Sequence, residues 1–289
     1  MNATHSPDTM FELLKTTLRF EYVRGGVTKI KPLYATGWRT VPEAVCAFIS
    51  DGEARLETTN EPPQHMRPGE AFLMPAGVRH CVTSTANTVY TSRWAHFRIT
   101  LFNTVDVFRF FMPPRIWRGA TAAEMGAVCA ELAELRTRMM TSNDASLRLL
   151  ARCKHLEFKL VDLIAEGSAP CDGANRLLDQ LHRLAPVLAR LDKDQETSLT
   201  LGDMAKLAGL SPSRFSALFQ EALDTSPAHY QGQQQFNRIV PQLMHTGKLI
   251  AQIAQEAGFS NESKFSKAFK RITGVSPRAY RTQRRHDVW

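Results

Sequence analysis

The segment from residue 258 to residue 285 combines a narrow apolar stripe with a dense positive charge. Eight Lys and Arg residues lie between Lys264 and Arg285. The apolar residues among them recur at the spacing of one helix face, namely Phe265, Ala268, Phe269 and Ile272. A surface helix needs one buried stripe, but it does not need so many cations on its remaining surface. A negatively charged partner is therefore indicated.

A second informative stretch is GEAFLMPAGVRH, residues 69–80. Gly69 can turn the chain into a strand, and Pro75 and Gly77 can form a tight turn after it. The next strand would then point His80 into the interior of a β unit. Other residues of this region are the aromatic and polar types that small-molecule pockets use, namely Trp38, Arg39, Tyr90, Trp94 and His96. Plain core packing is the alternative for the tryptophans, and a hydrogen-bonded interior histidine is the alternative for His80.

Composition and charge bound the class of protein. A chain of 289 residues holds about two domains, and 43% hydrophobic residues are enough for real cores. The net charge of +8 is uneven: residues 1–181 hold 21 Lys and Arg against 19 Asp and Glu, whereas residues 182–289 hold 15 against 9. This asymmetry favours a polyanion partner for the C-terminal part, with a solvated basic surface as the alternative.

The cysteines and the apolar runs indicate the compartment. The 5 cysteines are scattered and form no C-x-x-C pair, which is typical of free thiols in a reducing compartment. The N-terminus has no secretion-signal pattern, and no apolar run approaches the roughly 20 residues that span a bilayer. We expect a cytoplasmic protein without a membrane partner.

Three regimes follow one another along the chain. Residues 1–120 have short apolar runs broken by turn residues, which predicts an all-β unit. Residues 121–166 lack such punctuation and predict two helices joined as a hairpin. The small-residue stretch 167–176 is predicted to be a linker, and residues 177–289 a helical domain.

The helical domain contains an internal repeat. Phe215, Phe219, Pro227 and Tyr230 recur 50 residues later as Phe265, Phe269, Pro277 and Tyr280, and Ala205 and Gly209 recur 49 residues later as Ala254 and Gly258. Each copy predicts a helix, a sharp turn at a left-handed Gly, and a second helix. Ser211 with Pro212 would cap the second helix of the first copy, and Ser260 or Asn261 that of the second. This is the helix-turn-helix arrangement whose second helix enters the DNA major groove.

The residues from about 180 to 282 resemble the DNA-binding domain of the AraC/XylS family of bacterial transcription regulators. The matching stretches are LTLGDMAKLAGLSPSRFSALFQ and IAQIAQEAGFSNESKFSKAFKRITGVSPRAYR. The resemblance implies two helix-turn-helix units, joined by a long helix, that read successive major grooves of double-stranded DNA. The connecting segment departs from the family at Phe236, where Arg is usual, and at Pro241, which implies either a tolerated bend or altered spacing of the two DNA-reading helices.

In the second helix of each copy the Phe residues are expected to face inward. The remaining residues of these helices are the candidate DNA contacts. In the first copy they are Ser213, Arg214, Ser216, Ala217 and Gln220, and in the second Asn261, Glu262, Lys264, Ser266, Lys267 and Lys270. Arg214 could bind guanine and Gln220 adenine. Lys267, Lys270, Arg271 and Arg281 are interpreted as phosphate neutralisers, with solvated side chains as the alternative for each.

The spacing G-x5-P-x-G-x2-H of residues 69–80 resembles a cupin motif, and sensors of the AraC family commonly carry a cupin-like domain. The expected fold is therefore an all-β cupin-like barrel with a helical hairpin, followed by an all-α domain of two helix-turn-helix units. Cupin enzymes bind metal through further His and Glu residues, but residues 37–57 contain no His, and Glu43, Glu53 and His96 lie at other spacings. A metal enzyme is the alternative, and no catalytic residue, metal ligand or cofactor is expected.

The expected function is sequence-specific, DNA-binding regulation of transcription, controlled by a small-molecule effector in the barrel. The hairpin carries a long leucine-rich stripe, and the resemblance implies that it pairs two subunits into a homodimer; packing on its own barrel is the alternative. Contact with RNA polymerase is a further expected partnership. Two other hypotheses stay open, a ligand-free dimeric regulator and a redox sensor at Cys153, which lies between Arg152 and Lys154.

Overall fold

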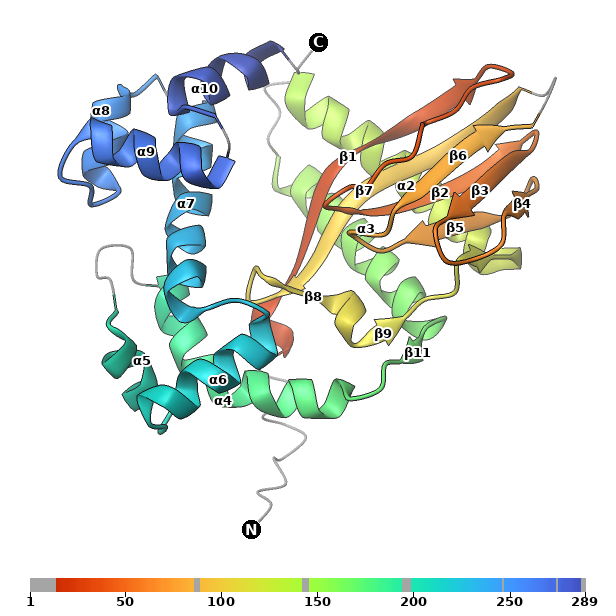
Figure 1. Cartoon of the computed structure of the whole chain (residues 1–289). Coiled ribbons are helices and arrows are strands. Elements are labelled where there is room, and N and C mark those ends of the chain that lie inside the picture. Colours follow the sequence, from red (N-terminus) through yellow and green to blue (C-terminus); the bar gives the residue numbers. More distant parts are fainter. Residues whose placement is uncertain are drawn as a thin grey trace. The chain divides into compact units, whose positions relative to one another are not determined.

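The computed structural model describes residues 14–85, 89–141, 146–193, 199–245, 247–273 and 275–286. The chain forms two compact units that divide between Ala174 and Asn175. The first unit is rich in strands, and the second is helical (Figure 1).

Two antiparallel sheets form the framework of the first unit. The larger sheet has the order β1-β7-β2-β5-β10, and β8 pairs with β7. Its strands are β1 (Leu18–Ile30), β2 (Ala44–Asp51), β5 (Ala71–Met74), β7 (Tyr90–Leu101), β8 (Val105–Asp106) and β10 (Ile116–Trp117). The smaller sheet has the order β4-β3-β6, with β3 (Ala54–Thr58), β4 (Gln64–Met66) and β6 (His80–Ser84). The expected all-β unit is confirmed, and it is built as two packed sheets.

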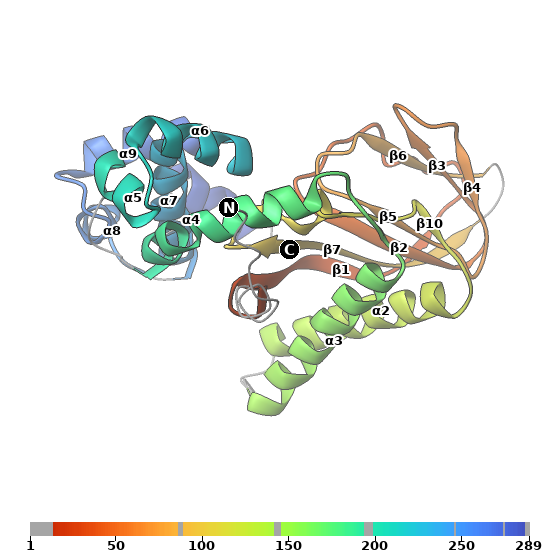
Figure 2. The same ribbon diagram turned by 90° about the horizontal axis from the view of Figure 1, so that it is seen from below.

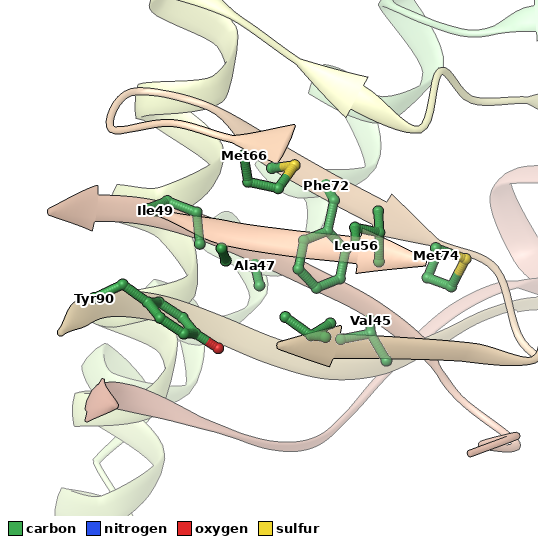
Figure 3. Close-up of a cluster of buried hydrophobic side chains, with 10 residues drawn as sticks. Val45, Ala47, Ile49, Leu56, Met66, Phe72, Met74 and Tyr90 are labelled. Carbon is green, nitrogen blue, oxygen red and sulfur yellow. The ribbon is translucent and has the colours of Figure 1, made fainter. Parts of the chain in front are cut away.

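The core of this unit lies between the sheets, as Figure 3 shows. Successive side chains of a strand point to opposite faces, so Val45, Ala47 and Ile49 of β2 face the smaller sheet. There they meet residues such as Leu56 and Met66. The intervening residues of β2 are buried as well, because helices cover the other face. A central strand buried on both faces explains the uninterrupted apolar run AVCAFI.

Helices α2 (Gly119–Thr141) and α3 (Leu147–Glu166) lie on the outer face of the larger sheet (Figure 2). The contact is close at Gly126, where a Cβ atom would stand 2.5 Å from the ring of Phe48. The predicted leucine stripe is largely buried within the unit, at Leu132, Leu135, Leu156, Leu160 and Leu163. These leucines therefore pack within their own unit, which was the alternative to pairing two subunits.

The segment after α3 remains tied to the first unit. Strand β11 (Ala169–Pro170) pairs with β9 (Phe111–Met112), which follows the short 3-10 helix η1 (Val107–Arg109). The Cys171 backbone N–H also donates to the Phe110 carbonyl at 2.8 Å. Part of the predicted linker 167–176 is thus paired backbone, and its last residues already belong to helix α4.

The second unit contains α4 (Ala174–Lys193), α5 (Leu201–Leu207), α6 (Pro212–Leu223), α7 (Pro227–His245), α8 (Ile250–Glu256), α9 (Glu262–Thr273) and α10 (Pro277–His286). The sequence repeat is a structural repeat, α5-α6 and α8-α9. In the first copy the Phe219 ring lies 5.4 Å from those of Phe215 and Tyr230. The second copy reproduces this cluster, with Phe269 lying 5.6 Å from Phe265 and 5.4 Å from Tyr280.

The turns of the two copies match as well. Gly209 has φ +64° and Gly258 has φ +77°, which is the predicted left-handed conformation. In each copy the next residue donates from its backbone N–H to the carbonyl of the repeated Ala at 2.9 Å, which closes the first helix. The helix-turn-helix geometry is therefore confirmed in both copies.

Candidate functional sites

The first unit contains a cavity of about 420 Å³ between its sheets. The lining comes from β1, the segment after it, and the inner faces of β2, β5, β6 and β7. Its members are Arg24, Thr28, Lys29, Ile30, Lys31, Tyr34, Thr36, Arg39, Val45, Ala47, Ile49, Phe72, Val82, Tyr90, Ser92, Trp94 and His96. A volume of this size lies within the range of small-molecule sites.

The cavity has an apolar floor and a basic rim. Buried aliphatic and aromatic side chains such as Val45, Ile49 and Phe72 form the floor. Strand β7 adds every second residue, from Tyr90 to His96, because alternate side chains share a face. The cations lie on β1 and in the segment 31–39, where the residues are more exposed: Arg24, Lys29, Lys31 and Arg39.

Arg39 is fixed by His80 rather than by an acid. The two residues exchange backbone hydrogen bonds of 2.9 and 3.0 Å, and the Arg39 Nε–H donates to His80 Nε2 at 3.3 Å. His80 Nδ1 lies 2.9 Å from the Val78 carbonyl, which can only accept, so the His80 proton sits on Nδ1. Burial and the charge of Arg39 lower the pKa of His80, which keeps the ring neutral.

His96 experiences the same positive field. Burial, followed by the charges of Arg24 and Arg39, lowers the pKa of His96 to about 4. The side chain is 3% exposed, and its Nδ1 has no hydrogen-bond partner in the described structure. Glu43 Oε2 stands 3.6 Å away, too far for a hydrogen bond, while Glu43 Oε1 accepts from Arg98 at 3.0 Å. The ring is therefore a neutral polar group with unused capacity.

The predicted ligand residues divide into three groups. Arg39, Tyr90, Trp94 and His96 line the cavity. His80 lies behind the lining and holds Arg39. Trp38 is 47% exposed outside the lining, with the Arg79 guanidinium 5.4 Å from its ring centre.

Sequence reasoning missed several lining residues, above all the cations Arg24, Lys29 and Lys31. The signal that could have found them is the concentration of basic residues in β1 and the segment directly after it. Burial raises the pKa of Tyr90 to about 12, so this predicted residue faces the cavity as a neutral phenol.

A resident metal does not fit the histidines of this region. Both ring nitrogens of His80 have partners, and one of these partners is a guanidinium, whose charge would repel a cation. Within the described ranges, no three His, Cys, Asp or Glu residues gather closely enough to hold a metal ion. Glu43, Glu53 and His96 therefore do not complete a site around His80.

The surroundings of Cys153 do not favour a reactive thiolate. Burial is the largest influence, and it raises the pKa of this thiol. The two basic neighbours are engaged elsewhere, because Arg152 pairs with Glu131 at 2.7 Å and Lys154 with Glu157 at 2.6 Å.

The second candidate site is formed by helices α6 and α9 of the helical unit. Their burial patterns are identical residue by residue from Ser211 to Gln220 and from Asn261 to Lys270. Two Phe residues face inward in each helix, and the predicted contact residues lie on the remaining surface. Ser216 and Ser266 are half-buried, whereas the others are exposed: Ser213, Arg214, Ala217, Gln220, Asn261, Glu262, Lys264, Lys267 and Lys270.

Capping fixes where each of these helices begins. The Ser211 hydroxyl accepts from the Arg214 N–H at 3.4 Å, with Pro212 in the first turn. In the second copy Asn261 performs this function, since its Oδ1 accepts from the Lys264 N–H at 2.9 Å. Arg214 and Lys264 thus occupy equivalent positions in the first turn of each helix.

Arg281 differs from the other predicted phosphate contacts. Its guanidinium donates to the Leu243 carbonyl at 3.1 Å and to the Lys248 carbonyl at 2.9 Å, and so ties α10 to the end of α7. The side chain of Arg271 lies outside the described part of the chain. Helix α7 continues past position 241, and the side chains of Phe236 and Pro241 also lie outside the described part.

Comparisons with known proteins agree with this division. Residues 26–158 match the AraC-like ligand binding domain, and residues 204–283 match a helix-turn-helix domain. The raffinose operon transcriptional regulatory protein RafR of Pediococcus pentosaceus is 23% identical over 82% of this chain and 84% of its own length. The probable transcriptional regulator LumQ of Photobacterium leiognathi is 29% identical over 83% of this chain and 88% of its own length.

Among solved structures, an AraC-type regulator from Chromobacterium violaceum shares 29% identity over 37% of this chain and 95% of its own, with a TM-score of 0.34.

In the described part of the chain, no helix has the length and apolarity to cross a membrane. The two domain matches together cover most of the chain, in the order that the two units have. The chain therefore belongs to the AraC family of transcriptional regulators, with an N-terminal ligand-binding domain and a C-terminal helix-turn-helix DNA-binding domain.

Proposed function

We propose that this regulator reads two successive major grooves with α6 and α9, and that a small molecule in the cavity controls its binding to DNA. The observation that carries the first part is the match between the two helices in exposure, capping and aromatic support. Two equivalent helices in tandem are the arrangement needed to contact two grooves about one helical turn apart. The cavity supports the second part, because an effector shifts an equilibrium only by binding two states unequally.

The two helices differ in their chemistry, and we assign them different roles. The exposed face of α6 offers Arg214 and Gln220, whose side chains can form paired hydrogen bonds with guanine and adenine. The equivalent positions of α9 hold Lys264 and Lys270, and Lys267 lies between them. Lysine is a point charge suited to phosphate, so α9 contributes affinity more than base selection.

The experiment that tests this assignment begins with selection of genomic DNA fragments by the full-length protein. Binding of a selected fragment is then measured by fluorescence anisotropy at several salt concentrations. Lys267→Ala should weaken binding to all DNA sequences alike. It should also lower the slope of log binding constant against log salt concentration, the salt slope, by about one unit. Arg214→Ala should reduce the free energy of binding to the selected site by about 1–3 kcal/mol. It should also change the order of affinities for sites that differ at one base position.

Arg55→Ala, on β3 of the first unit, is the matched control for loss of one exposed cation. It should leave both the salt slope and the order of affinities unchanged. Equal effects of the Arg55 and Lys267 variants would show that only net charge is involved, and the assignment of α9 would be wrong.

We further propose that the protein acts as a homodimer in the cytoplasm and contacts RNA polymerase there, with no enzymatic role. The support for dimerisation is a group of exposed apolar residues on one side of α3, namely Leu147, Leu150 and Phe158, with Lys154 in the turn between the last two. Joining two copies raises the effective concentration of the second DNA-binding unit once the first has bound. Family membership supports the cytoplasmic site and the polymerase contact.

A further inference from the structure

The charge in the cavity is unbalanced. Four lining residues are cations, and no Asp or Glu belongs to the lining. Within the described ranges, the ion pairs of the first unit engage other arginines and lysines, such as Arg98, Arg115 and Arg118. Basic side chains gathered at one opening without acids attract an anion and repel a cation.

One of these cations is held in position for an incoming group. Arg39 uses its Nε for His80, and its two terminal nitrogens have no partner among the described residues. Those nitrogens form the planar fork that matches the two oxygens of a carboxylate or phosphate. The G-x5-P-x-G-x2-H stretch thus supplies a positioning residue, because His80 accepts from the Arg39 Nε and is itself held by the Val78 carbonyl.

The other walls add uncharged groups. His96 is a buried neutral ring with an unpartnered nitrogen, and Tyr90 is a neutral phenol. The floor between them is apolar, formed by Val45, Ile49 and Phe72. The cavity therefore matches a molecule with an anionic end and an apolar body, rather than one with hydroxyl groups on every side.

We propose that the cavity binds a small organic anion, whose charged group is gripped by the Arg39 fork among the rim cations and whose apolar body lies on the floor of β2 and β5. This inference rests on the proposed function, since it names the chemical class of the effector. The anionic group is a carboxylate or a phosphate monoester, because the fork accepts both.

The test measures binding of four probes to the full-length protein by isothermal titration calorimetry. They are 4-phenylbutanoate, its neutral amide 4-phenylbutanamide, the cation 4-phenylbutylamine, and phenyl phosphate. The amide matches the acid in size and shape, so the ratio of their dissociation constants isolates the charge. We expect an anion to bind at least about tenfold tighter than the amide, and the amine to bind least. Comparing 4-phenylbutanoate with phenyl phosphate distinguishes the two anionic groups.

Arg39→Gln should reduce the preference for the anion over the amide by about tenfold or more. The matched control is Arg79→Gln, which removes a nearby cation that stacks on Trp38 outside the lining and should leave the preference intact. His80→Leu should lower the preference, while a purely structural role would weaken acid and amide equally.

The outcomes separate this inference from the proposed function. Equal binding of acid and amide would overturn anion recognition and leave the cavity as an effector site. No binding of either anion at millimolar concentration would overturn the inference and favour a ligand-free regulator. DNA binding, measured separately on the same preparation, decides the DNA-reading role independently of both results.

Discussion

At the scale of single residues, partners decide the chemistry of the two cavity histidines. His80 is neutral with its proton directed to the Val78 carbonyl, so its second nitrogen can accept from a guanidinium. His96 is neutral because burial and neighbouring positive charges oppose its protonation. The two histidines therefore differ in their tasks: His80 holds Arg39, and His96 lines the cavity as a neutral ring.

The neutral state of His96 predicts a pH dependence of stability. An unfolded His protonates near pH 6.5, whereas folded His96 resists protonation down to about pH 4. Between these values the unfolded state binds more protons, so the free energy of unfolding falls as the pH falls. His96 alone should account for a loss of about 2 kcal/mol between pH 7 and pH 5.

Urea unfolding of wild type and His96→Gln, followed by tryptophan fluorescence at both pH values, tests this prediction. The wild type should lose more stability than the variant by about that amount, because Gln does not titrate. The charged and titratable groups that surround the ring, namely Arg24, Arg39, Glu43 and His80, remain in both proteins. Parallel losses would show that His96 is not the titrating group.

At the scale of elements, replacing a turn glycine of the repeat by Ala should have the opposite effect on stability from replacing a helical glycine. A Cβ atom added at Gly209 would meet nothing within 4 Å, so Gly209→Ala introduces only the strain of the left-handed conformation, about 1–2 kcal/mol. Gly202 lies within α5, and a Cβ atom there would meet only the Thr200 hydroxyl at 3.7 Å. Gly202→Ala should therefore stabilise the unit by up to about 1 kcal/mol.

Hydrogen–deuterium exchange of peptides covering residues 199–223 reports these changes locally. Exchange should become faster in the Gly209 variant and slower in the Gly202 variant. A loss of protection in both would indicate that α5 tolerates no added methyl group, and the conformational explanation for Gly209 would then be wrong.

The helical repeat was predictable from sequence because its signals are local. Turn glycines, caps and paired phenylalanines lie within about 20 residues of each other, and each fixes a backbone feature directly. The cavity was predictable only in part. Tyr90, Trp94 and His96 were grouped only by residue type, and they do share one face of β7, whereas Trp38 lies in the loop segment 31–39, where no period determines the direction of a side chain.

The pairing of Arg39 with His80 could not be predicted from the sequence. It depends on a bridge between residues 39 and 80, which are far apart in sequence and belong to no common motif. The motif pointed to His80 as the ligand contact. In the fold, His80 instead holds Arg39, and Arg39 is the residue that lines the cavity.

At the scale of the whole molecule, the exposed face of α3 makes a prediction about assembly. The stripe expected to pair two subunits is largely buried, so the proposed interface is the face of Leu147, Leu150 and Phe158 instead. Leu150→Glu places a charge there and should raise the dissociation constant of the dimer at least about tenfold. Sedimentation equilibrium at several protein concentrations measures this change.

Met112→Glu is the control, since Met112 is an exposed apolar residue of β9, in the same unit but on another element. It should leave the dimer intact. A wild-type protein that stays monomeric at tens of micromolar, or equal effects of both variants, would contradict the proposed interface.

The tandem repeat has one more consequence. The α5-α6 and α8-α9 copies follow each other head to tail along one chain, and their exposed faces are unlike, with Arg and Gln in one and Lys in the other. A palindrome reads the same from both strands, but a site matched to two unlike helices in a fixed order does not. Each DNA-binding unit therefore imposes a polarity, and we expect inversion of its target sequence to turn the protein to face the opposite way along the promoter.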